Sequence, residues 1–270
     1  MALERTCRYE PLTRAPLVLV LCEVRFSPIK QIASYIAPIQ ERFRRSGFPI
    51  ERGGKVRAVT VSPSGIQAAE RDRWEYRTKD ERWSVMITEN SVILQTTAYE
   101  RFETFAERLS GALRTVLAET EHDRLGVVQR VGLRYIDLVQ PREGEDHRFY
   151  LKPGLHGVTE GVFAAGSQRL FQVNVGHTQV GDVEGFMVLR ITQNDQGIDV
   201  PPDLVDGAPK LESRSRVGEL VTFVDMDHFI ERNFEPNTDE VIAYSYRLHD
   251  HIIETFHEHI VTKEGMDVWR

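Results

Sequence analysis

Two aspartates, Asp225 and Asp227, stand two positions apart in a run of strand-forming residues. Alternate residues of a strand share one face of a sheet, and this face is otherwise apolar. Buried carboxylates there require a cationic partner, a bound ligand or a position at the rim. Arg25 and Arg134 also lie in apolar strands and are the candidate partners. The pattern predicts either a structural ion-pair network or a ligand-binding site formed by these four residues.

A second group of polar residues lies near the carboxyl end of the sequence, where Glu254 and His257 are separated by two residues. This spacing occurs in carboxylate-bridged two-metal sites of helix bundles. The neighbouring His249 and His251 are only two positions apart, so on a helix they point in nearly opposite directions. We therefore favour a solvated polar helix face over a metal site, and we expect no cofactor.

Aromatic and basic residues alternate between positions 73 and 83. Trp74, Tyr76 and Trp83 are interleaved with arginines, a pattern found on sheets that stack single-stranded nucleic acid on exposed rings. Acidic residues in the same segment bring its charge close to zero. Packing of the rings across neighbouring strands is the favoured interpretation, and nucleic-acid binding is the alternative.

The common catalytic motifs are missing from the sequence. There is no Gly-rich phosphate-binding loop, no nucleophile elbow and no His-Glu-x-x-His zinc motif. A net charge of −7 and a pI near 5.8 argue against a general nucleic-acid coat. Two cysteines are too few for a disulfide framework, and the longest apolar run is too short to cross a membrane. We expect a cytoplasmic protein that does not contact the membrane, and the missing motifs favour a non-catalytic protein over an enzyme.

The first part of the chain predicts a strand, a helix, a meander and a second helix. Residues 17–26 form the strand, and Ser27-Pro28 begins a helix that ends at Gly47, with a kink or break at Pro38. Residues 55–97 alternate with a period of two, which predicts three to five antiparallel strands with a tight turn at Glu89-Asn90. An apolar stripe over residues 102–117 predicts the second helix.

The remainder of the chain repeats this order. Residues 127–139 predict a strand, residues 141–166 a long connection, and residues 199–216 a loop. Further strands are expected near residues 169–176, 186–192 and 219–231. Asn237, with Glu240 three positions later, predicts the start of a final helix that extends to Ile260.

The two halves can be aligned with each other, because Arg25 and Arg134 each stand between an apolar and an aromatic residue near the end of an opening strand. We predict an α+β fold with an internal duplication, in which antiparallel sheet is backed by long amphipathic helices. The expected units are an extension over residues 1–16, a first half over residues 17–122 and a second half over residues 123–270. Either one continuous sheet or two separate sheets fit this pattern.

Three segments resemble a known group of proteins. They are Tyr9-Glu-Pro-Leu12, the run Ala15-Pro-Leu-Val-Leu-Val-Leu-Cys-Glu-Val-Arg-Phe-Ser-Pro28, and Gly132-Leu-Arg-Tyr-Ile-Asp137. Together with Asp225-Met-Asp-His228 and the closing segment from Phe256 to Thr262, they are similar to a sporadically distributed bacterial family of about this length. The resemblance implies a bacterial origin, a single full-length unit and inheritance of the kind seen in mobile or defence-linked genes. It assigns no activity and no site residue.

These observations favour a non-catalytic binding or accessory protein that acts with a partner protein, and a homodimer is compatible with them. A small-molecule-binding protein or enzyme, with a pocket between sheet and helices, is the first alternative. A single-strand nucleic-acid binder is the second.

Overall fold

The computed structural model of the chain describes Tyr9 and residues 12–62, 65–157 and 170–270. Its strands form one antiparallel sheet of nine strands in the order β2-β3-β4-β5-β1-β6-β9-β8-β7. The strands are β1 (Leu17–Phe26), β2 (Ile50–Ser62), β3 (Gly65–Arg77), β4 (Trp83–Thr88), β5 (Ser91–Thr96), β6 (Val128–Val139), β7 (Phe171–Val180), β8 (Val183–Gln196) and β9 (Val217–Phe234). The α+β class predicted from the sequence is confirmed, and the sheet is continuous.

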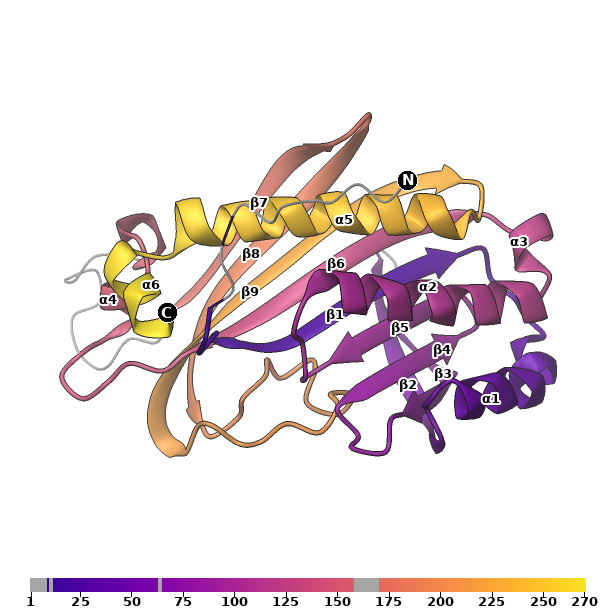
Figure 1. Cartoon of the computed structure of the whole chain (residues 1–270), viewed down its shortest axis with the longest axis horizontal. Coiled ribbons are helices and arrows are strands. Elements are labelled where there is room, and N and C mark those ends of the chain that lie inside the picture. The colour runs from indigo at the N-terminus through magenta and orange to yellow at the C-terminus, as the bar shows by residue number, and fades with distance from the viewer. Residues whose placement is uncertain (1–8, 10–11, 63–64, 158–169) are drawn as a thin grey trace.

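Helices cover one face of this sheet, here named the helix-side face (Figure 1). The long helices are α1 (Ile36–Arg45), α2 (Phe102–Glu119) and α5 (Thr238–Thr255). The short segments are η1 (Ile32–Tyr35), α3 (His122–Leu125), α4 (His147–Tyr150), η2 (Pro153–Leu155), η3 (Phe256–Ile260) and α6 (Lys263–Trp269). In the described part of the chain, no helix is both long enough and apolar enough to cross a membrane.

Strand β1 lies in the middle of the sheet and joins its two halves. It pairs with β5 on one side, where Cys22 faces Leu94, and with β6 on the other, where Cys22 faces Leu133. Every second side chain of β1 enters the core beneath the helices, and these side chains belong to Val20, Cys22, Val24 and Phe26. The apolar residues of this strand explain its position, because only a central strand is covered on both sides by neighbours.

The opposite face, here named the loop-side face, is partly covered by the connection from β8 to β9. This connection contains no helix or strand, as predicted, and it crosses the first half of the sheet. Its backbone is fixed there by hydrogen bonds from Arg77 to the carbonyl of Ala208 (3.2 Å) and from the amide of Lys210 to the carbonyl of Glu81 (2.9 Å). A second, smaller apolar cluster lies beneath it, with Phe223 and Leu138 among its buried members.

The helix predicted to start at Pro28 begins later than expected. A short 3-10 turn precedes α1, and Pro38 is the third residue of α1. An amide hydrogen in the first turn of a helix has no partner within that helix, so proline is tolerated there. Pro38 therefore stands near the start of the helix and does not kink it.

Asn237 caps α5 as predicted, because its side-chain oxygen accepts hydrogen bonds from the amides of Asp239 (2.9 Å) and Glu240 (3.3 Å). Replacing Asn237 with alanine should lower the free energy of unfolding by about 1 kcal/mol, since these two amides lose their acceptor. Urea unfolding followed by circular dichroism measures this loss. An equal loss from Asn233→Ala, at an exposed position of β9, would contradict the capping role.

Candidate functional site

The register of β9 separates its side chains as the sequence predicted. Asp225 and Asp227 lie on the loop-side face, whereas His228 points beneath α5, where its Nδ1 lies 3.2 Å from the carbonyl oxygen of Leu248. Strand β6 places Arg134 beside Asp227 and Ile136 beside Asp225 in the ladder. The predicted carboxylates are therefore on the face opposite the helices, and a pocket between sheet and helices does not include them.

Arg134 and Asp225 form a closed ion pair. The Nε and Nη2 atoms of Arg134 donate to the two carboxylate oxygens of Asp225 at 2.8 and 2.7 Å. Asp225 is only 3% exposed, and Arg190 on β8 approaches it at 3.3 Å. Asp203, in the β8–β9 connection, accepts a further bond from Arg134 at 2.8 Å. Burial alone would lower the pKa of Arg134, but the hydrogen bonds to Asp225 and Asp203 raise it above its ordinary value.

Asp227 pairs with Arg130, a residue that the sequence did not single out. Arg130 reaches Asp227 at 3.4 Å and Glu23 at 2.9 Å, and its guanidinium lies over the ring of Phe229 at 4.3 Å. Burial raises the pKa of Asp227, and Arg130 opposes that rise. The available signal was the spacing of Arg130 and Arg134, because residues four apart on a strand share a face.

The predicted pairing of Arg25 with these aspartates is wrong. Arg25 bonds to Glu23 at 2.9 Å and is 47% exposed, so among the described residues Glu23 is its link to the network. The cause is the register between β1 and β6, which places Arg25 opposite Arg130. Arg134, Arg130, Asp225 and Asp227 thus neutralise one another, and their contacts are those of a structural network.

At the edge of the loop-side face, next to this network, strand β7 exposes several apolar side chains. The sequence analysis did not predict a site there. Phe171 and Val175 on β7 are 71% and 62% exposed, and Val173 between them is also exposed. Val173 is in register with Arg190, and Val175 with Val188. β7 is the last strand of the sheet, and among the described strands its one partner is β8. We name Phe171, Val173 and Val175 the β7 stripe.

The β7 stripe was missed because its alternation favours the opposite orientation. A strand with apolar residues at every second position is expected to turn them toward the core. Here Thr178 and Val180 face the helices, and Thr178 lies 2.9 Å from Nε2 of His228. The apolar residues consequently face away from the helices, and in Figure 1 the β7–β8 hairpin projects past α5.

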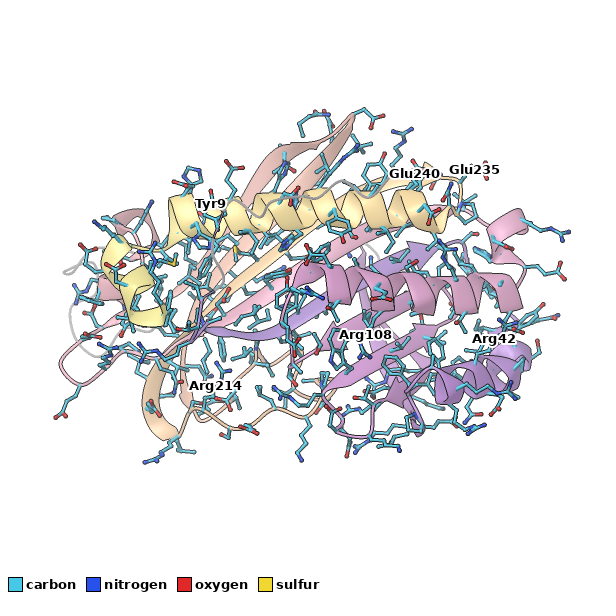
Figure 2. The ribbon with its side chains drawn as sticks, in the orientation of Figure 1. Tyr9, Arg42, Arg108, Arg214, Glu235 and Glu240 are labelled. Atoms are coloured by element: carbon cyan, nitrogen blue, oxygen red, sulfur yellow. The ribbon has the colours of Figure 1, made fainter. Side chains whose placement is uncertain are left out.

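The aromatic residues proposed as a nucleic-acid platform lie mainly in the core. Tyr76 and Trp83 are buried, and Trp74 is half-buried. Phe43 of α1 stacks on Tyr76 with ring centres 5.2 Å apart, and Arg108 of α2 lies over Trp83 at 4.6 Å (Figure 2). Two of the three rings are therefore packed away from solvent, which favours the packing interpretation over a nucleic-acid platform for Tyr76 and Trp83.

His257 and Glu254, the proposed metal pair, show no metal-ligand arrangement. Tyr9, labelled in Figure 2, stacks on His257 with ring centres 4.2 Å apart and donates a hydrogen bond to Glu258 at 3.0 Å. Burial lowers the pKa of His257. Among the residues that the structure describes, no group of three His, Cys, Asp or Glu side chains could hold a metal ion.

A cavity of about 400 Å³ does lie between the sheet and the helices, but other residues line it. We name it the helix-side cavity. Its wall includes Tyr99, Phe102, Tyr135, Asp137 and His249. None of the four residues predicted to form a pocket takes part in it.

No protein-family model matches the chain, and no curated protein matches it. The resemblance to a sporadically distributed bacterial family therefore stays a prediction.

Proposed function

We propose that the protein is a non-catalytic binding protein that acts with a partner protein, and that an extended segment of the partner adds to the sheet at β7. The observation that carries this proposal is the exposed β7 stripe on an edge strand. Contiguous apolar residues on a surface are characteristic of interaction sites. An added strand would hydrogen-bond to the β7 backbone and pack its side chains against the stripe.

The composition of β7 supports strand addition. Edge strands of proteins that remain alone are commonly guarded by charged residues or proline, which discourage pairing with other chains. The ten residues of β7 contain no Asp, Glu, Lys, Arg or Pro. The strand thus lacks these guards along its whole length.

The charged network next to the stripe is consistent with a binding role. Arg190 lies between Val173 and Asp225 in the register, so apolar and charged rows adjoin each other on the loop-side face. Interfaces commonly combine an apolar centre with a polar rim. The carboxylates of the network are already paired with arginines, so the network favours positioning over catalysis.

We infer that the two halves arose by duplication, which would account for a broad sheet whose halves meet at its centre. β1 and β6, the first strands of the two halves, pair at the centre of the sheet. In each half the last strand, β5 or β9, lies beside the first one, and the strands between them in sequence lie farther out. Each half then ends in a helix of 18 residues, α2 or α5, packed against the other. The first half has one additional strand, so the two outer edges differ.

Replacing Val175 with lysine should abolish partner binding and leave the fold intact, because a charge would be buried at the interface but solvated in the free protein. The measurement is native mass spectrometry of the tagged protein isolated from its own cells. We expect a stoichiometric protein partner with the unaltered chain and none with Val175→Lys.

The matched control is Val217→Lys, because Val217 is 85% exposed on β9 and lies outside the stripe. It should retain the partner. A complex of twice the 31.0 kDa mass, lost with Val175→Lys, would show that the strand pairs with a second copy instead. Isolation of the unaltered chain without any protein partner would contradict the proposal.

A further inference from the structure

The helix-side cavity is bounded by β6 and β9, the start of α2, the carboxyl-terminal part of α5 and the segment before β1. Its volume of about 400 Å³ falls within the range of small-molecule sites. Most of its wall is aromatic or apolar, and these residues are Tyr9, Leu12, Ala15, Pro16, Leu17, Tyr99, Phe102, Tyr135, Met226, Ile253 and Phe256.

The polar groups of the aromatic wall bond to one another. The hydroxyl of Tyr135 donates to the hydroxyl of Tyr99 at 3.0 Å and lies 2.8 Å from Nδ1 of His249. The His249 ring stacks on Phe102, with ring centres 4.2 Å apart and planes 4° apart. Burial raises the pKa of Tyr135 well above its ordinary value, which keeps this hydroxyl neutral. This aromatic part of the wall is therefore hydrogen-bonded within itself, and the Tyr135 hydroxyl adds no negative charge to it.

Asp137 differs from the rest of the wall. It lies two residues after Tyr135 on the same face of β6 and is 4% exposed. The structure gives its carboxyl no hydrogen bond or ion pair with any described residue. Burial raises its pKa to about 8. A buried carboxyl without a partner is unfavourable in its charged form, so the site gains stability when a ligand supplies the partner.

We propose that the helix-side cavity binds a small organic cation, a protonated amine with an apolar body, and that Asp137 is its counter-ion. Aromatic faces attract cations, and a desolvated carboxylate adds charge and a hydrogen-bond acceptor. Glu100, Arg101 and Glu103 also line the cavity, but they are exposed and solvent screens them. This proposal is independent of the β7 stripe.

The test is calorimetric titration of the full chain at pH 8.5 with 2-phenylethylamine, compared with neutral 2-phenylethanol and anionic 3-phenylpropanoate. We expect the amine to bind at least 10-fold more tightly than either analogue, because only the amine pairs with Asp137. Asp137→Asn should lose this preference. Asp182→Asn, at an exposed carboxylate beside Arg232, is the matched control and should keep it.

The pH dependence provides a second readout. With a pKa of about 8, Asp137 is ionised in only a few per cent of molecules at pH 6.5, so amine affinity should rise about 20-fold from pH 6.5 to 8.5. His249 and His257 also face the cavity, and the Asp137→Asn variant reveals any dependence that belongs to them.

Carbon NMR of the unaltered protein tests whether Asp137 pairs with the bound amine, and it requires no variant. Binding of 2-phenylethylamine should lower the pKa of the Asp137 carboxyl, because the ammonium group stabilises the carboxylate. Equal binding of the neutral analogue, an unchanged preference in Asp137→Asn, or no binding of the amine would each overturn the proposal.

Discussion

Replacing Arg134 with methionine is expected to lower the free energy of unfolding by about 3 kcal/mol. Asp225 is 3% exposed and receives two short hydrogen bonds from Arg134. Methionine fills similar space but leaves the buried carboxylate with Arg190 alone, at 3.3 Å. Losing the two short hydrogen bonds from Arg134 leaves this buried carboxylate only partly compensated, and an under-compensated buried charge is costly. Urea unfolding at pH 7 measures the loss.

Arg25→Met is the matched control for this experiment. Arg25 is a strand arginine on the same face, but it is 47% exposed and pairs only with Glu23. Exposed ion pairs contribute little, so its loss should cost less than about 1 kcal/mol. Equal losses from the two variants would refute the interpretation that Arg134 neutralises a buried aspartate.

Replacing Asp137 with asparagine should remove a pH dependence of stability. Burial raises the pKa of Asp137 from 3.8 to about 8, so the folded protein retains a proton that the unfolded chain releases. The stability from this protonated state is complete below about pH 4 and is lost as the pH rises toward 8. At about 1.4 kcal/mol per pKa unit, Asp137 lowers the free energy of unfolding by up to about 4 kcal/mol between pH 5 and 8.

Urea unfolding of both proteins at pH 5 and pH 8 measures this effect. Other groups titrate in both proteins, so the informative quantity is the difference between the two unfolding free energies at each pH. That difference should shift in favour of Asp137→Asn as the pH rises. A difference that stays constant would show that Asp137 is ionised in the folded protein over the whole range.

Much of the fold was predictable because its elements have strong local signals. The short run of apolar residues in β1, the turn at Glu89-Asn90 and the cap at Asn237 each depend on neighbours in sequence. Pro38 was misjudged because the sequence does not show where the first turn of α1 begins. The single continuous sheet was not predictable, since pairing between β1 and β6 joins residues about a hundred positions apart.

The contacts within the candidate sites were harder to predict, because they join strands that are far apart in the sequence. Strand periodicity was enough to predict that Asp225 and Asp227 share a face of the sheet. Their arginine partners depend on how the strands are aligned, and this alignment pairs Asp227 with Arg130 and not with Arg25. Asp137 gave no signal, because a single aspartate at the end of an apolar strand resembles an ordinary rim residue. Its burial results from α5 and from the segment before β1, which reach it from opposite ends of the chain.

The central position of β1 has a consequence for synthesis. A ribosome makes Leu17–Phe26 first, but β5 (Ser91–Thr96) and β6 (Val128–Val139), which flank it, are made much later. Until then, its consecutive apolar residues have neither neighbours nor a covering helix. Such runs are prone to aggregate while they wait. We therefore expect the nascent chain to be most prone to aggregation until β6 has been made.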